Sequence, residues 1–83
     1  MKYQRGIINM ETKYKIGNKV KVNSENDNEN YDDFRNKVLV ITDIATNIQE
    51  HKGFDEGVNQ PLYSFKDEKG KDINCSLYEY EIE

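Results

Sequence analysis

Alternation of apolar and charged residues at both ends of the 83-residue chain is the feature that most constrains its fold. Residues 15–22 (KIGNKVKV) place a turn before alternating lysine and valine, and residues 77–83 (LYEYEIE) alternate apolar residues with glutamate. A period of two residues is typical of strands that bury one face. Such strands at the two ends predict a small closed β-barrel, with the lysines protecting an exposed edge against pairing with other chains.

A chain of this length holds one domain with a thin core, because small domains bury only about two thirds of their unfolded surface. Six tyrosines, three phenylalanines and several valine and isoleucine runs indicate that the core forms even though 34% of the residues are charged. We expect the domain to span residues 13–83. Residues 1–12, which show no clear period, are expected to be an N-terminal appendage in which Met10 offers an alternative start.

The remaining strands are expected between turn signals. Residues 37–44 (KVLVITDI) give the strongest strand signal and predict the central strand, with a bulge near Val40 and Ile41. Residues 62–65 and 72–76 predict a hairpin around the turn at 67–70, followed by one helical turn at 77–79 and a last strand at 80–83. Residues 24–33 predict a solvated loop in which only Tyr31 is buried, and residues 47–60 predict a second, longer loop.

This pattern resembles the SH3-like small barrels, including KOW-type barrels and small phage or mobile-element proteins of that shape. The opening at residues 15–20 is similar to the family's frequent "lysine, apolar, glycine, Asp or Asn, x, valine" start, and residues 77–83 are similar to its closing turn and strand. The resemblance implies a five-stranded barrel with one long loop and a short helical turn before the last strand. It implies no particular ligand, and the absence of tryptophan disfavours the proline-peptide groove of signalling SH3 domains.

Charge and cysteine content narrow the classes of partner. The net charge is -4, with six bases and one acid up to Lys21 and six bases and fifteen acids after it. The acidic part disfavours a nucleic-acid partner, because it repels phosphates. A single cysteine permits no internal disulfide, and no apolar run is typical of a signal peptide or a membrane span. We therefore expect a cytoplasmic protein with no membrane association.

Catalytic, metal and cofactor sites are each disfavoured. His51, close to Glu50, Asp55 and Glu56, could bind a divalent metal, but one histidine without a repeated ligand spacing is more typical of a solvated loop. The acids within residues 27–33 lack the glycine and terminal glutamate of a calcium-binding EF-hand loop. Cys75 could pair with His51 as a thiol nucleophile, but its position beside Ile73 favours a small core residue. We therefore expect no enzyme, no metal and no cofactor.

The aromatic residues indicate a surface for another protein, because tyrosine is enriched at protein interfaces. Phe54, between two glycines in the long loop, either plugs the end of the barrel or is an exposed anchor. The expected partner-binding residues are Tyr31, His51, Phe54, Asp55, Glu56, Tyr63, Tyr78 and Tyr80.

Three functions remain, in order of preference. The first is a non-catalytic protein-interaction module that binds through a barrel face and the loop at 47–60. The second is an acidic, phage-type inhibitor of a nucleic-acid-binding enzyme, an anti-defence protein whose carboxylates at 24–33 and at the C-terminus replace phosphates. The third is weak nucleic-acid binding through Lys13, Lys15, Lys19 and Lys21, with affinity that falls steeply as salt is added. The identity of the partner and the oligomeric state stay open.

Overall fold

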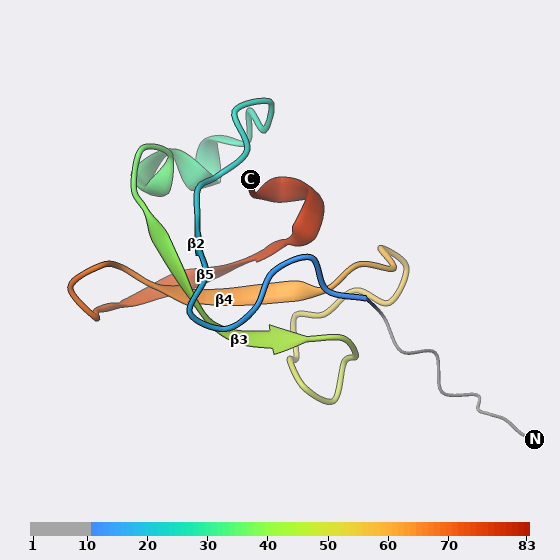
Figure 1. The fold of residues 1–83 in the computed structure, drawn as a ribbon. Helices are drawn as coiled ribbons and strands as arrows, with labels where there is room; N and C mark the ends of the chain where they lie inside the picture. Colours follow the sequence, from blue (N-terminus) through green and yellow to red (C-terminus); the bar gives the residue numbers. More distant parts are fainter. Residues whose placement is uncertain (1–10) are drawn as a thin grey trace, which may run out of the picture.

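Within residues 11–83, four antiparallel strands form one sheet, accompanied by two short 3-10 helices (Figure 1). The computed structural model describes residues 11–83, so Met10 and most of the expected appendage lie outside the described residues. The strands lie in the sheet in chain order, and the expected mainly β fold with few helices is confirmed. Their bounds are β2 (Lys19–Val20), β3 (Leu39–Ala45), β4 (Leu62–Lys66) and β5 (Asp72–Tyr78), and the 3-10 helices are η1 (Glu29–Phe34) and η2 (Glu79–Glu81).

The first strand has the alternation that the sequence predicts. Val20 and Val22 are buried, whereas Lys19 and Lys21 are exposed. The turn before the strand depends on Gly17, whose φ of 93° lies in the region that favours glycine. Backbone hydrogen bonds between this turn and Ile41 attach it to β3, and β2 itself pairs with the first residues of β3.

The predicted central strand and its bulge are confirmed. β3 pairs with β2 through Leu39 and Val40 and with β4 from Val40 to Ala45, so it lies between the two. The register shifts between Ile41 and Asp43, which leaves one extra residue on β3. A bulge bends a strand and increases its twist, and β3 curves strongly in Figure 1.

The predicted hairpin of β4 and β5 is also confirmed. Its turn is closed by Asp67, whose Oδ1 accepts hydrogen bonds from the backbone nitrogens of Lys69 and Lys71, both at 2.9 Å, and these bonds lower the pKa of the carboxyl group. Gly70 has a φ of 89° at the end of the turn. Further along, the register changes between Ser64 and Phe65, so that two residues of β5, 74 and 75, bulge away from β4.

Side chains from the two faces of the sheet form two apolar clusters. The larger cluster is the main core and contains Val20, Val22, Leu39, Ile41, Tyr63, Phe65, Leu77 and Ile82. The smaller cluster lies on the opposite face, where Ala45, Leu62 and Tyr78 are cross-strand neighbours. Phe54 from the long loop covers this second cluster, so the loop at 47–60 is anchored to the sheet.

The prediction of a loop over residues 24–33 is wrong in part, because the second half of this segment forms η1. Asn28 caps this helix by accepting a hydrogen bond from the backbone nitrogen of Asn30 at 3.0 Å. Arg35 then holds the segment by bonding to the carboxylate of Asp32 and to backbone carbonyls of the loop. Asparagine side chains favour such caps, and Tyr31 of η1 packs against the main core as expected.

The expected order of elements at the C-terminus is also wrong. β5 continues to Tyr78, and the helical turn is η2, two residues later than the sequence predicts. The Glu81 side chain accepts from the backbone nitrogen of Tyr78 at 2.8 Å, which closes a capping box and removes residues 79–81 from the strand conformation. Of the predicted last strand only Ile82 makes a bridge, to Val22, flanked by two backbone bonds between Lys21 and Glu83 at 2.8 and 2.9 Å.

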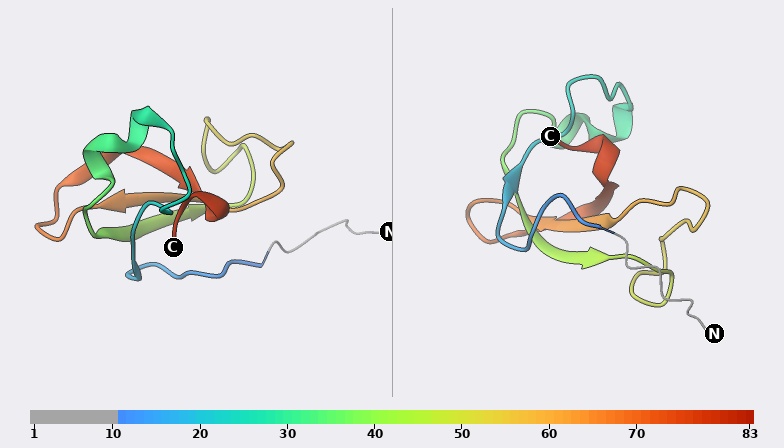
Figure 2. Two further views of the ribbon diagram at one scale, coloured as in Figure 1. Left: turned by 90° about the horizontal axis from the view of Figure 1, so that it is seen from above. Right: turned by 45° about the vertical axis from the view of Figure 1, so that its right-hand side comes forward.

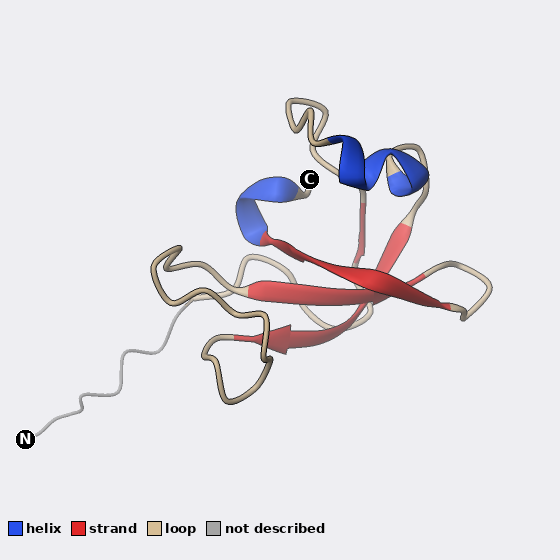
Figure 3. Ribbon diagram, turned by 180° about the vertical axis from the view of Figure 1, so that it is seen from behind, coloured by secondary structure: helices blue, strands red, loops and turns tan. Residues whose placement is uncertain are grey.

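The two 3-10 helices lie on the same side of β3, β4 and β5, the side towards which β2 also turns (Figures 2 and 3). The long loop between β3 and β4 lies at one end of the sheet, and the hairpin turn of β4 and β5 lies at the other. Within residues 11–83, no helix has the length and apolar character needed to cross a membrane.

A candidate binding face along β5 and η2

A hollow of about 360 Å³ runs along the bulged part of β5. The sheet contributes the small side chains of Asn74, Cys75 and Ser76 to its wall. Tyr31 reaches it from η1, and His51 reaches it from the long loop. Because the bulge removes residues 74 and 75 from pairing with β4, this stretch of β5 is accessible beside two rings that come from other parts of the chain.

The long loop is held on this face by two polar contacts with β5 and by one hydrogen bond within the loop. His51 Nε2 lies 3.1 Å from Ser76 Oγ, and His51 Nδ1 accepts a hydrogen bond from the backbone nitrogen of Gly53 at 2.9 Å. The Tyr78 hydroxyl accepts from the backbone nitrogen of Asp55 at 2.6 Å. With Phe54 buried between them, these contacts give the loop a defined position on the sheet.

A stacked pair of tyrosines extends the face onto η2. The rings of Tyr78 and Tyr80 are 6.3 Å apart and tilted by 9°, and Tyr80 is 58% exposed. Gln60 Oε1 accepts from the backbone nitrogen of Tyr80 at 2.8 Å, which holds η2 against the loop. Tyr80 also lines a second hollow, of about 470 Å³, together with Glu81 and residues 23 and 25–28.

Glu81 connects the two hollows, because it lines both. It is 8% exposed and is the one buried charged residue among residues 11–83. The negative charge affects its neighbours: burial, and then Glu81, raise the pKa of Tyr31 to about 12. Burial, and then the same carboxylate, also raise the pKa of the Cys75 thiol.

The polar groups of the face do not form a nucleophile with its base. In the neutral ring, a Nδ1 that accepts from Gly53 leaves the proton on Nε2, so His51 donates to Ser76 rather than accepting its proton. A general base for a serine needs the opposite arrangement, with a third group that orients Nδ1–H. Cys75, whose pKa is raised, is likewise unlike an activated thiol, which needs a lowered pKa.

Four of the eight expected partner-binding residues come together on this face: Tyr31, His51, Tyr78 and Tyr80. The prediction is wrong for Tyr63 and Phe54, because these residues are 0% and 4% exposed and belong to the two apolar clusters. Phe54 is therefore not an exposed anchor. Asp55 and Glu56 are exposed in the loop, where Asp55 Oδ1 accepts from the backbone nitrogen of Gly57 at 2.8 Å.

Glu81 is the residue of this face that sequence reasoning missed. A strict period of two over residues 77–83 directs its side chain outwards with the other glutamates. The 3-10 turn breaks this period and directs it inwards. The signal that was available is the capping relation between Tyr78 and Glu81, three positions apart, although serine or threonine more often begins such a box.

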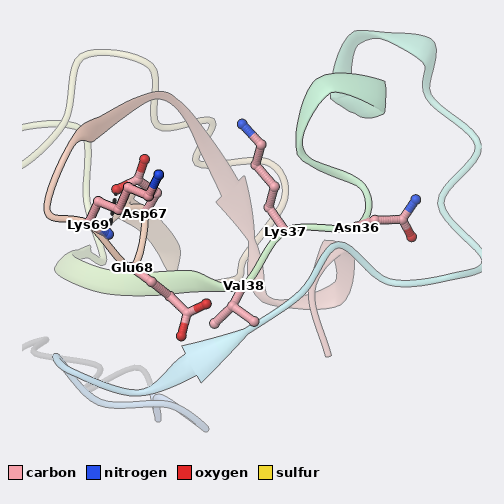
Figure 4. Close-up of a pocket in the computed structure, with 6 residues that line it drawn as sticks. All are labelled: Asn36, Lys37, Val38, Asp67, Glu68 and Lys69. Carbon is pink, nitrogen blue, oxygen red and sulfur yellow. Dashed lines mark hydrogen bonds between the residues drawn. The ribbon is translucent and has the colours of Figure 1, made fainter.

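A third hollow, of about 380 Å³, lies at the other end of the sheet (Figure 4). In this hollow the polar side chains do not converge, since Lys37 and Asn36 extend away from Glu68 and Val38. Asp67 is already bonded to the backbone of Lys69 within its turn. This hollow therefore offers less to a ligand than the face along β5 and η2.

Within residues 11–83, no three His, Cys, Asp or Glu side chains are grouped so that they could hold a metal ion. Comparisons of the chain with family models, with curated proteins and with solved structures found no match. The function is therefore inferred from the residues of the face itself.

Proposed function

We propose that the protein is a non-catalytic interaction module that binds another protein through the face along β5 and η2. The observation that carries this proposal is the stacked pair of Tyr78 and Tyr80, one anchored and one exposed, between two hollows. Protein interfaces are enriched in tyrosine, which buries a large area at a low cost in conformational entropy. The loop at 47–60 takes part by fixing His51 and Tyr78 rather than by presenting Phe54.

The proposal includes the finer fold assignment, a five-stranded SH3-like barrel. Pairing between residues 21–23 and 81–83 supports it, because these bonds connect the first strand of the sheet to the segment after the last. In this assignment Ile82 belongs to a short fifth strand that closes the barrel, with Val22 opposite it. Closure of the barrel also pairs the backbone N–H and C=O groups of an edge strand, which would otherwise be open to pairing with other chains.

Affinity capture from a bacterial lysate tests the function, with and without nuclease treatment. We expect the full chain to retain a protein partner that nuclease does not release and that the Tyr80→Ala variant loses. Ile16→Ala is the matched control, because Ile16 is a large apolar residue with 64% exposure before β2, away from the face. Equal capture by both variants, or recovery of nucleic acid alone, would contradict the proposal.

A second candidate function is the acidic inhibitor that occupies the substrate groove of a nucleic-acid-binding enzyme. Its support is the exposed acidic residues of the segment at 25–33, of which Asp32 alone takes part in one of the two ion pairs found within residues 11–83, with Arg35. Neutralising Glu25, Asp27 and Asp33 would then abolish capture of such an enzyme, whereas Tyr80→Ala would leave it. The opposite result would favour the first function.

A further inference from the structure

Glu81 carries a buried charge without a counter-ion among the described residues. Its neighbours there are neutral donors, the backbone nitrogen of Tyr78 at 2.8 Å and the hydroxyl of Tyr31 nearby. Neither of the two ion pairs formed within residues 11–83 includes Glu81. These donors offset part of the cost of burying the carboxylate but supply no opposite charge, so a cation from outside would be stabilised beside this residue.

The hollow between residues 23–28 and η2 has the composition of a site for a positively charged group. Three acidic residues line it, together with three asparagines and Tyr80, and no base is among its lining residues. An exposed tyrosine ring attracts a cation placed over its face. The hollow thus combines three acidic residues, one of them nearly buried, with an exposed aromatic residue, Tyr80, in one place.

The wall of this hollow is organised before any ligand binds. The backbone nitrogen of Asn26 donates to the carbonyl of Asn23 at 2.9 Å, and Arg35 bonds to the carbonyls of Asn26 and Asn28. On the other wall, η2 is fixed by Gln60 and by the pairing of Asn23 with Glu81 through a backbone bond of 2.8 Å. A preorganised site lowers the entropy that binding must overcome.

We propose that this hollow receives an arginine side chain of the partner protein, with its guanidinium group facing Glu81 and lying against the Tyr80 ring. A guanidinium presents a planar set of donors to a carboxylate, stacks on aromatic rings and is more weakly hydrated than an ammonium group. Lysine offers a strongly hydrated point charge and would therefore bind less well. The inference rests on the proposed function and adds the chemistry that the partner must present.

Titration of the isotope-labelled full chain, followed by ¹H–¹⁵N correlation spectra, tests the inference without an identified partner. The probe is N-acetyl-arginine methylamide, and its neutral isostere is N-acetyl-citrulline methylamide. We expect saturable shifts of the backbone amides of residues 23–28 and Tyr80 with the arginine probe. Binding of the citrulline probe should be weaker by about tenfold, as expected for loss of one charge-assisted hydrogen bond.

Two variants connect the binding to the named side chains. Glu81→Gln removes the charge but keeps an oxygen that accepts from Tyr78, so the capping box is retained, and it should weaken binding of the arginine probe about tenfold. Glu56→Gln makes the same change at an exposed position outside both hollows and should leave binding unchanged. If Glu81→Gln loses its folded spectrum, Tyr80→Ala replaces it, with the same expected weakening.

Equal binding of the arginine and citrulline probes, equal effects of Glu81→Gln and Glu56→Gln, or shifts spread over all acidic surfaces would overturn the inference. Capture of a partner that depends on Tyr80 but not on Glu81 would overturn the inference while the proposed function stands. If the arginine probe binds specifically but no captured protein depends on Tyr80, the proposed function is contradicted. The hollow is then a site for arginine that does not serve to bind a partner protein.

Discussion

Tyr78 connects a buried aromatic residue to an exposed one. Its ring meets that of Phe54 edge-on at 6.1 Å and stacks on that of Tyr80 at 6.3 Å. Its hydroxyl also accepts from the backbone nitrogen of Asp55. The position of the exposed ring therefore depends on how the long loop packs on the sheet, so the stability of the loop and the shape of the binding face are coupled.

Removing the Phe54 ring should destabilise the protein strongly. Phe54→Ala leaves a cavity over Ala45 and Leu62, and such losses cost about 3–5 kcal/mol in the free energy of unfolding. Ile48→Ala, in the same loop but at a half-exposed position, should cost less than about 1 kcal/mol. Urea denaturation followed by circular dichroism measures both, and equal effects would show that Phe54 is not the anchor of the loop.

The hydroxyl group of Tyr63 should contribute to stability separately from its ring. It donates to Glu79 Oε1 at 2.7 Å, which also accepts from the backbone nitrogen of Lys13 at 2.7 Å. Tyr63→Phe keeps the ring and removes this bond, at an expected cost of about 1–2 kcal/mol in the free energy of unfolding. Tyr14→Phe, which keeps the edge-on contact with Tyr63, serves as the control and should change stability by less than about 0.5 kcal/mol.

Alkaline pH should weaken the fold in part through Tyr31. Its pKa is raised from 10.0 to about 12, so between these values the folded chain keeps a proton that the unfolded chain has lost. The stability that this group contributes is complete below pH 10.0 and falls as the pH rises towards about 12. Chemical denaturation at several pH values should show a steeper decline for the native chain than for Tyr31→Phe, and parallel curves would contradict this prediction.

The larger elements could be predicted because each follows from a local signal. The alternation around Val20 predicts β2, and the apolar run at 37–44 predicts the central strand β3. The turn at 67–70 predicts the hairpin of β4 and β5. None of these signals depends on residues distant in the sequence. The predictions are wrong where a side chain forms a hydrogen bond with the backbone and so determines the local conformation. Asn28 caps the start of η1, and the Glu81 side chain bonds back to the residue before η2; both helices replace structure expected from composition or period alone.

The candidate site could be predicted only in part, for the same reason. Composition identifies Tyr31, Tyr78 and Tyr80 as aromatic residues in excess of a thin core, but not which rings the core takes up. Tyr63 and Phe54 are buried because β4 has both faces covered at its start, which depends on where the long loop returns. Glu81 required the geometry of η2, and no pattern of charge reveals it.

Cys75 should react slowly with alkylating reagents, and Glu81 should be part of the cause. Burial, and then the carboxylate, raise the pKa of the thiol, so less of the reactive thiolate is present near pH 8 than in an exposed cysteine. Glu81→Gln should accelerate alkylation by iodoacetamide, and Glu56→Gln should not. The unfolded chain in urea should react at the rate of a model thiol, and no difference between it and the folded chain would contradict the burial of Cys75.

Photo-crosslinking from position 80 tests the central claim most directly. A p-benzoylphenylalanine in place of Tyr80 is irradiated in a bacterial lysate, with the same group in place of Ile16 as the control at another exposed position. The account predicts one nuclease-resistant protein adduct from position 80 and none of that mass from position 16. Adducts of the same proteins from both positions, or adducts to nucleic acid alone, would contradict the claim that the face along β5 and η2 binds a protein.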